Sequence, residues 1–207
     1  MARDTQSIVK MSRREGYALH PKAHKALVKR TSMPGEQQGG GRGRRGKASQ
    51  YSVQLREKQK VKRLYGLLER QFAKLMSEAV RGQGQSGASL LEFLERRLDN
   101  VVYRAGLAVS RRAARQLVSH GHFMLNDRRV DIPSIRVVAG DVITLRERSK
   151  STDYFKHLEE VSPPPAAIPD WIKVNRKSVQ IKVSGNPTRE DAEPDIKEQL
   201  IVEYYSR

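Results

Sequence analysis

The side chains in this sequence that could do chemistry are mainly arginines, lysines and histidines. The chain of 207 residues has no cysteine, so it can form neither a thiolate zinc site nor a cysteine nucleophile. Its serines, histidines and acidic residues do not fall into the arrangement of a catalytic triad or a carboxylate pair within any motif. The residue types therefore favour binding of an anion over catalysis, and we expect no enzymatic activity and no cofactor.

Positive charge is concentrated in the first third of the chain. There are 40 Lys and Arg against 23 Asp and Glu, a formal net charge of +17; residues 1–63 carry +13 of this, whereas residues 151–207 carry −2. Crowded cations repel one another unless a polyanion neutralises them, so nucleic acid is the favoured partner and an anionic membrane surface comes second. No apolar run approaches the roughly 20 residues that cross a bilayer, and we expect a cytoplasmic protein.

A run rich in glycine and arginine resembles a nucleotide-binding loop. Residues 41–46 fit the spacing G-x-G-x-x-G, and Lys47 extends the match to the first part of a phosphate-binding loop. Both kinds of site need a strand before the loop, which is not expected here, and Ala48 stands where a hydroxyl would hold Mg²⁺. We expect instead a flexible cationic segment. The side chains expected to contact phosphates in it are Arg42, Arg44, Arg45 and Lys47.

Four of the five histidines stand in two pairs. His20 and His24 could share a helix face, but two imidazoles without a third ligand rarely bind a metal. His120 and His122 flank Gly121 and cannot share a helix face. We therefore expect no metal site, and we expect the second pair to stack on RNA or to donate to phosphate.

Apolar spacing predicts helices at both ends of the chain. Residues 1–34 suggest one or two short helices. Residues 51–80 carry an apolar stripe at three- and four-residue steps, which predicts a long helix that Gly66 kinks or divides. Lys58 extends the cationic zone along this helix, and we expect it to contact RNA. Residues 195–205 predict a helix, with a strand as the alternative.

Two further helices are predicted to form one basic platform. The first starts at a capping box of Ser89 and Glu92 and ends at Gly106; the second starts after Ser110 and ends at Gly121. On a helical wheel, the apolar residues of each helix gather on one side and the arginines on another. We therefore expect the arginines of both helices to face outward.

The hydrophobic period then changes to two, which predicts strands. The expected strands are 122–125, 129–132, 135–138 and 141–146, followed by a helix at 153–161, a proline-rich connector, and strands at 171–175 and 178–183. Trp171 is expected to fill the core or an interface. The predicted fold is α+β, with a mainly helical N-terminal domain and a module of two helices followed by a small, mostly antiparallel sheet. The expected segments are a basic extension and loop at 1–48, a helical domain at 49–89 that 190–207 completes, an RNA-binding module at 90–152, and a linker with extra strands at 153–189.

Residues 90–148 resemble the RNA-binding module of the family of small-subunit ribosomal protein four. The segments that carry the resemblance are 94–104 (LERRLDNVVYR), 110–122 (SRRAARQLVSHGH) and 140–143 (GDVI). Similar modules occur in pseudouridine synthases, tyrosyl-tRNA synthetases and stress proteins. The flanks resemble the bacterial ribosomal family, at 12–16 (SRREG), 54–60 (QLREKQK), 65–72 (YGLLERQF) and 198–207 (EQLIVEYYSR). The resemblance therefore extends over nearly the whole chain.

The sequence departs from that family at two places. Many relatives have Cys-x-x-Cys before the Arg-Arg-Glu-Gly segment and bind zinc there, whereas this chain has Val9 and Ser12. It resembles the zinc-free branch, whose N-terminus must be ordered by RNA and packing alone. The usual Asn-Gly hairpin turn is replaced by Asn126 and Asp127, which predicts a strained turn or one of another type.

The resemblance implies a structural component of the small ribosomal subunit. It implies a primary binder of small-subunit (16S) ribosomal RNA that nucleates assembly of the subunit body and contributes to translational accuracy. It also implies contact with small-subunit ribosomal protein five and a position near the mRNA entry path; we expect no homo-oligomer. A DNA-binding helix-turn-helix regulator and an RNA-modifying enzyme that carries the same module remain as alternatives.

Arginines held on two helices can bind phosphates bidentately, which suits RNA whose base edges are hidden in a narrow major groove. The module residues expected to contact RNA are Arg111, Arg112, Arg115, Gln116, His120, His122 and Arg128.

Overall fold

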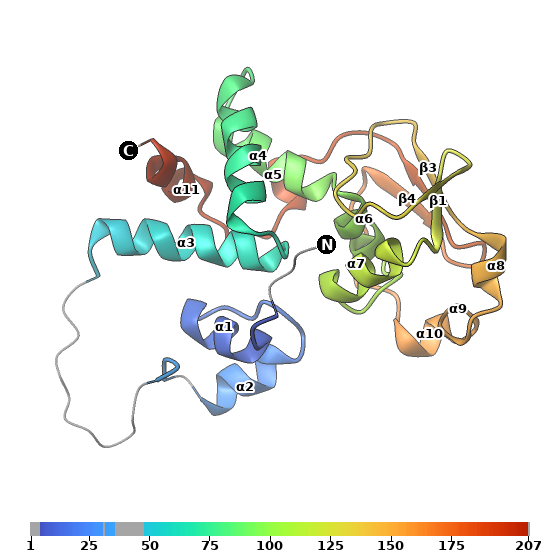
Figure 1. Cartoon of the computed structure of the whole chain (residues 1–207), viewed down its shortest axis with the longest axis horizontal. Coiled ribbons are helices and arrows are strands. Elements are labelled where there is room, and N and C mark those ends of the chain that lie inside the picture. The colour runs from blue at the N-terminus through green and yellow to red at the C-terminus, as the bar shows by residue number, and fades with distance from the viewer. Residues whose placement is uncertain (1–4, 31, 36–47, 207) are drawn as a thin grey trace. The chain divides into compact units, whose positions relative to one another are not determined.

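The chain forms two compact units in a computed structural model that describes residues 5–30, 32–35 and 48–206 (Figure 1). Unit 1 comprises Met1–Gly87 and Asp195–Arg207, and unit 2 comprises Ala88–Pro194. The architecture is α+β, as predicted, whereas the division into four functional segments stays a prediction.

Unit 1 is helical. Its helices are α1 (Ile8–Glu15), α2 (Ala23–Lys29), α3 (Gln50–Leu64), α4 (Glu69–Arg81) and α11 (Glu198–Tyr205). Gly66 adopts a positive φ of 67° between α3 and α4, so the prediction that it divides the long helix is confirmed. The short N-terminal helices and the helical tail are confirmed as well. The apolar stripes of α3 and α4 are buried, with Val61 and Phe72 fully inaccessible.

Hydrogen bonds and ion pairs of its own side chains anchor the N-terminal helix α1. Ser12 is fully buried; its Oγ donates to the carbonyl oxygen of Ile8 at 2.8 Å and accepts from the backbone N–H of Leu19 at 3.2 Å. The Glu15 carboxylate at the end of the same helix is buried and pairs with Arg56 and Arg63 of α3. Hydrogen bonds and a buried ion-pair cluster therefore hold α1 in place.

Unit 2 begins with α5 (Ser86–Glu95), which starts in unit 1, and continues with α6 (Leu98–Arg104) and α7 (Arg111–Ser119). The prediction of one helix between the Ser89 cap and Gly106 is wrong, because Ser89 lies inside α5 and the helix is interrupted at residues 96–97. There the backbone bonds to a distant segment: the N–H of Leu98 donates to the carbonyl of Ile135 at 2.8 Å, and that of Val137 donates to the carbonyl of Arg96 at 2.9 Å. These pairings replace the helical hydrogen bonds.

The described part of unit 2 contains a five-stranded antiparallel sheet in the order β2-β1-β3-β5-β4. Its strands are β1 (Phe123–Leu125), β2 (Arg128–Val130), β3 (Val142–Leu145), β4 (Ile172–Asn175) and β5 (Gln180–Val183). The strand predicted at 135–138 is wrong, since this segment forms only an isolated bridge between Arg136 and Arg97. The helix predicted at 153–161 is two short ones, α9 (Asp153–Lys156) and α10 (Leu158–Val161), preceded by α8 (Glu147–Lys150).

The β1–β2 hairpin turns at Asn126 and Asp127, whose φ angles are 48° and 62°. Two consecutive positive φ values are the geometry of the type I′ hairpin turn, so the turn type is the usual one despite the aspartate. The Asn126 side chain supports it by donating to Asp141 Oδ1 at 2.7 Å.

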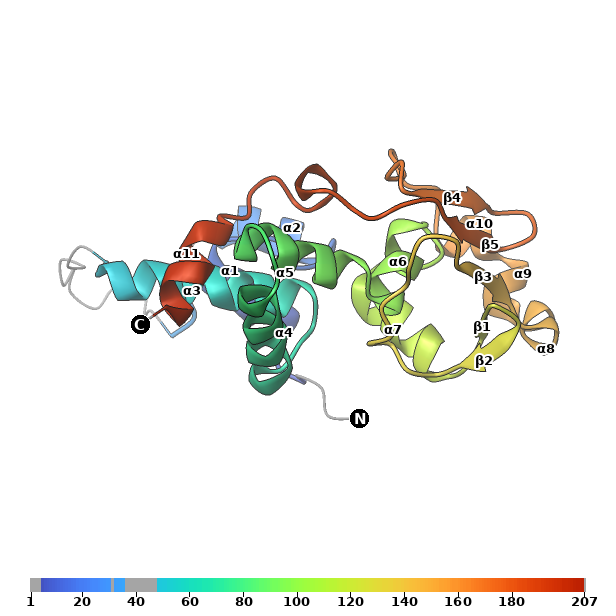
Figure 2. The ribbon, with the colours of Figure 1, turned by 90° about the horizontal axis from the view of Figure 1, so that it is seen from above.

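One hydrophobic core joins α6 and α7 to the sheet, which lies beside them (Figure 2). Leu98, Val118, Phe123 and Ile143 are fully inaccessible. Trp171 is 5% exposed and belongs to this core, the first of the two places expected for it. The paired helices are thus packed against the sheet through this core, and this positions the polar side chains on their outer surfaces.

Candidate nucleic-acid interface

Helix α7 separates an apolar face from a basic one. Ser110 caps the helix by accepting from the backbone N–H of Ala113 at 3.2 Å, as predicted. Ala114, Leu117 and Val118 are buried against the core. The helix therefore presents its polar residues on the opposite side, where they can contact a ligand.

Arg112 and Gln116 are exposed on this outer face, four residues apart and so one turn apart. Within the described residues, neither side chain makes a hydrogen bond or ion pair. His120 follows them as an exposed residue at the end of the helix. This group offers a guanidinium, an amide and an imidazole that are available to an anionic ligand.

The other two arginines of α7 are engaged inside the unit. Arg111 donates to Asn100 Oδ1 at 2.8 Å and to Glu193 Oε1 at 3.0 Å, and its guanidinium lies 4.6 Å from the centre of the Tyr103 ring. Arg115 donates to Asp99 Oδ2 at 3.2 Å. Both lie on the basic side of α7, but carboxylates of this chain offset their charges.

The prediction that α6 and the segment before it turn their arginines outward is wrong in part. Arg97 is buried and forms a two-bond ion pair with Asp99, at 3.1 and 2.8 Å. Glu95 is also buried; it accepts from Asn100 and from the guanidinium of Arg104. A buried guanidinium is stable only when it is paired, so these contacts replace exposure to solvent. The platform is built on an internal network of charges.

His122 packs into the module near its histidine neighbour. The His120 and His122 ring centres are 6.0 Å apart, and Nδ1 of His122 is 3.0 Å from Ser149 Oγ. The His122 ring also meets Phe155 edge-on, at 5.6 Å between centres. Burial, with smaller contributions from His120 and Arg146, lowers the pKa of His122 below its ordinary value. This favours the neutral imidazole at pH 7, which can donate or accept a hydrogen bond but adds no positive charge.

Arg128 is exposed on β2, and its side chain makes no hydrogen bond or ion pair within the described residues. Its neighbour Arg129 was not predicted as a site residue. The Arg129 guanidinium lies over Gly121, where an added Cβ would meet its Nε at 2.9 Å. The glycine therefore lets an arginine of the sheet approach the end of α7, and the Arg-Arg pair after the turn is the sequence signal that could have indicated it.

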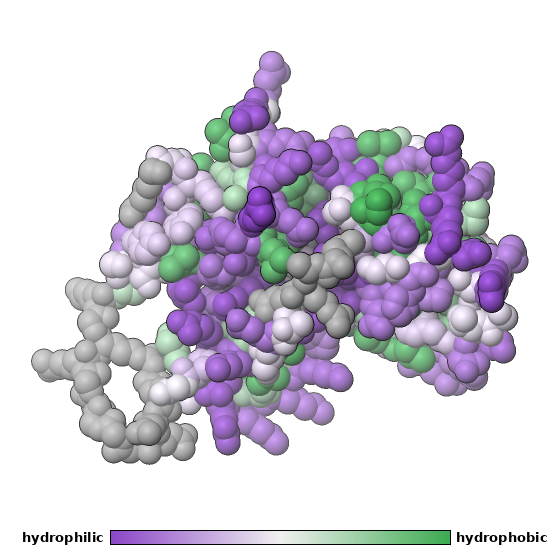
Figure 3. Space-filling model, in the orientation of Figure 1, coloured by the Kyte–Doolittle hydropathy of each residue, from purple (hydrophilic) through white to green (hydrophobic). Residues whose placement is uncertain are grey.

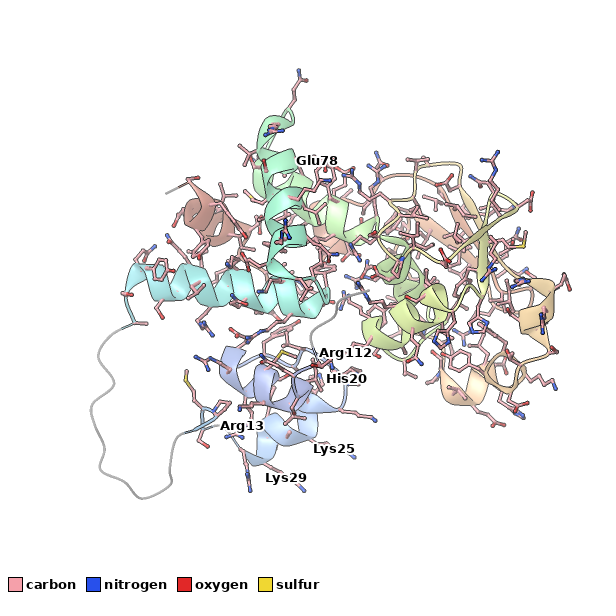
Figure 4. The ribbon with its side chains drawn as sticks, in the orientation of Figure 1. Arg13, His20, Lys25, Lys29, Glu78 and Arg112 are labelled. Carbon is pink, nitrogen blue, oxygen red and sulfur yellow. The ribbon has the colours of Figure 1, made fainter. Side chains whose placement is uncertain are left out.

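The first two helices present a second basic surface, on unit 1. Figure 4 shows Lys25 and Lys29 projecting from α2, and Figure 3 shows hydrophilic side chains over this region. The Arg13 side chain does not project freely in this way, because its guanidinium donates to the carbonyl oxygen of Ser32 at 2.8 Å. The only carboxylate on these helices is that of the buried Glu15, whose pKa burial raises while Arg56 opposes the shift. The excess of cations in residues 1–63 is the sequence signal for this surface.

Lys58 does not lie on an open surface. It is 4% exposed, its Nζ donates to Glu69 Oε1 at 2.7 Å, and the same Nζ lies 4.4 Å from the centre of the Tyr204 ring. Burial acts to raise the pKa of Glu69, but hydrogen bonds from Lys58 and Lys62 outweigh it and lower that pKa to about 2. The ammonium of Lys58 is thus engaged by residues of α4 and α11, and its contact with RNA stays a prediction.

Arg42, Arg44, Arg45 and Lys47, the predicted phosphate-contacting side chains of the glycine-rich segment, lie outside the described residues. Among the described residues there is no group of three His, Asp or Glu side chains that could hold a metal ion. In the same part of the chain, every helix is too short or too polar to cross a bilayer.

Comparison with known proteins identifies the family. Residues 96–143 match the model of the S4 domain, and residues 3–95 match that of the ribosomal protein S4/S9 N-terminal domain. The chain is 51% identical to small ribosomal subunit protein uS4 of Clostridioides difficile (strain 630), 50% to that of Herpetosiphon aurantiacus and 48% to that of Chlorobium luteolum; each match covers the whole of both chains. This chain belongs to the uS4 family. The resemblance seen in the sequence is confirmed, and this uS4-family chain is one without cysteine.

Proposed function

We propose that this chain is a structural component of the small ribosomal subunit and binds small-subunit ribosomal RNA directly. The relatives that it matches over the whole of both chains are named small ribosomal subunit proteins. The observation that supports RNA binding most is the outer face of α7, where Arg112, Gln116 and His120 are exposed beside a charge-paired scaffold. No catalytic role is proposed for any of these residues.

The proposed contacts are with phosphates and with the shape of the RNA. A-form RNA hides its base edges in a narrow major groove, so a protein recognises phosphate spacing and 2′-hydroxyl groups. A rigid helix with a fixed guanidinium suits this better than flexible lysines do. We propose Arg111, Arg112, Arg115, Gln116, His120, His122 and Arg128 as the contacts of the module, and Arg42, Arg44, Arg45 and Lys47 as those of the glycine-rich segment.

We also propose partners and consequences that the family resemblance implies. These are contact with small-subunit ribosomal protein five, a position near the mRNA entry path, early assembly of the subunit body and an influence on translational accuracy. The chain would act as one copy in a ribonucleoprotein. A DNA-binding regulator would need base-reading side chains at the start of α7, where Arg111 is instead paired with Glu193.

The test is a binding comparison at matched salt. The full chain is titrated with small-subunit ribosomal RNA fragments, tRNA and mixed-sequence duplex DNA. We expect preference for the ribosomal RNA, and about eight neutralised phosphates would make log K fall against log salt with a slope of roughly −6 to −7. Preference for duplex DNA would refute the proposal in favour of the regulator, and chemical turnover of tRNA would refute it in favour of the RNA-modifying enzyme.

A further inference from the structure

A carboxylate of unit 2 lies between two guanidinium groups of its helices. Oε1 of Glu193 is 3.0 Å from Nη2 of Arg111 and 3.6 Å from Nη2 of Arg104. The Glu193 side chain is 23% exposed, so solvent and ligands can reach it, whereas the two arginine side chains are 11% and 18% exposed. One carboxylate oxygen thus occupies the position that an external anionic oxygen would take between two arginines.

The two arginines are held in place without Glu193. Arg104 donates two hydrogen bonds to the buried Glu95 carboxylate, at 3.0 and 2.9 Å. Arg111 donates to Asn100 at 2.8 Å and lies over the Tyr103 ring. Because these contacts come from α5 and α6, the guanidinium pair is preorganised whether or not the carboxylate is present.

The residue that supplies the carboxylate belongs to a connecting segment. Glu193 follows the short helix η1 (Arg189–Asp191) and lies outside every helix and strand. Its contact with Arg111 joins residues 82 positions apart in the chain. A carboxylate on such a segment can withdraw without breaking a helix or a strand pairing.

We propose that Arg104 and Arg111 form a phosphate-binding site that Glu193 occupies in the free chain and that an RNA phosphate takes over in the complex. The inference rests on the proposed function, and it adds Arg104 as a ligand and Glu193 as an internal competitor. With Glu95 still paired to Arg104, removal of the Glu193 carboxylate leaves the site with a net charge of +1. A phosphate oxygen can accept from a guanidinium N–H as the Glu193 carboxylate oxygen does, so the exchange preserves the hydrogen bond from Arg111. The Glu193 carboxylate therefore lowers the affinity of the chain for any RNA whose phosphate has to displace it.

The experiment measures binding of a small-subunit ribosomal RNA fragment to the full chain and to the variant Glu193→Gln. The matched control is Glu190→Gln, because Glu190 is exposed three residues away and forms no ion pair within the described residues. We expect Glu193→Gln to bind about two- to fivefold more tightly, the upper part of the range for losing a partly exposed ion pair, and the control to change by less than about 1.5-fold. In an Arg111→Ala background, Glu193→Gln is expected to give no gain.

Hydrogen exchange of backbone amides distinguishes displacement of Glu193 from a general effect of removing one negative charge, because only displacement changes the exchange rates near Glu193. On binding RNA, the backbone amides of residues 188–193 are expected to exchange faster while those of α7 become protected. Equal affinities of Glu193→Gln and Glu190→Gln, a gain that persists in the Arg111→Ala background, or unchanged exchange at 188–193 would each overturn the inference. In those cases binding of ribosomal RNA by the unaltered chain would leave the proposed function standing; failure of the unaltered chain to prefer this RNA would refute the proposed function itself.

Discussion

The buried ion pair between Arg97 and Asp99 provides a sharp test of how the α6–α7 platform is stabilised. The side chains of Arg97 and Asp99 are 5% and 6% exposed, and two hydrogen bonds join them. Asp99 also accepts from Arg115, whose side chain is 15% exposed. The substitution Asp99→Asn keeps the shape of the side chain but removes its charge and directs an amide N–H₂ toward donors.

The loss of stability in Asp99→Asn depends on whether Arg97 and Arg115 can reach solvent once the carboxylate is gone. Arg115 can turn toward solvent, but Arg97 cannot, so its charge is left buried without a counter-ion. Breaking a buried pair in this way costs about 3–5 kcal/mol, and the partial escape of Arg115 places Asp99→Asn near the lower end, about 3 kcal/mol. With a urea slope of about 1.5 kcal/mol per molar for a unit of this size, the unfolding midpoint is expected to fall by about 2 M.

The fluorescence of Trp171 measures this transition directly, because the chain's single tryptophan is buried in the core of unit 2. The control is Glu92→Gln, which removes one negative charge from the partly exposed pair with Arg96, whose atoms are 3.0 Å apart. That pair is expected to contribute only about 0.3–0.5 kcal/mol. If Asp99→Asn shifts the midpoint no more than Glu92→Gln does, the reasoning about the buried charge is refuted.

Three further outcomes are expected. Arg112→Ala should weaken binding of small-subunit ribosomal RNA and flatten its salt slope by about 0.7–0.9, whereas Arg112→Lys should keep most of the slope; an unchanged slope in the alanine variant would exclude a phosphate contact. Gly106→Ala should lower the urea midpoint of the tryptophan transition by the equivalent of about 2–4 kcal/mol, because φ is 69° and the new Cβ would lie 2.3 Å from Pro165 Cδ; a midpoint within error of the unaltered chain would contradict this. The pKa of Glu69 is lowered to about 2, so the unfolded chain binds the proton more readily, and the stabilisation by this carboxylate is complete above about pH 4.5 and lost as the pH falls toward 2. The melting temperature of the chain minus that of Glu69→Gln should therefore shrink over this range, and a constant difference would show that the pKa is not lowered.

The features that sequence predicted correctly are those decided by neighbouring residues. Ser110 caps α7 because its hydroxyl reaches an N–H three residues away. Gly66 divides α3 from α4 because it adopts a left-handed conformation that other residues rarely take. The hairpin turn lies at Asn126 and Asp127, as predicted, but the alternative of another turn type is wrong, because both residues adopt the positive φ of a type I′ turn.

The features that sequence missed depend on residues far apart in the chain. The break between α5 and α6 results from backbone pairing with residues 133–137, which no local periodicity reveals. A helical wheel places the arginines on the polar side but carries no information about which carboxylates approach them from other segments. Arg111 meets Glu193 across 82 residues, and Arg115 meets Asp99 across 16. The sequence therefore shows which residues on the helices are basic. It does not show which of them are exposed and which form ion pairs within the chain.

The most direct test of RNA binding by the α7 surface is a cryo-microscopy map of this chain assembled on small-subunit ribosomal RNA. We expect density for RNA backbone along the outer face of α7, with phosphate oxygens within hydrogen-bonding distance of Arg112 and Gln116. A map in which that face meets only solvent, or packs against another polypeptide, would contradict the account.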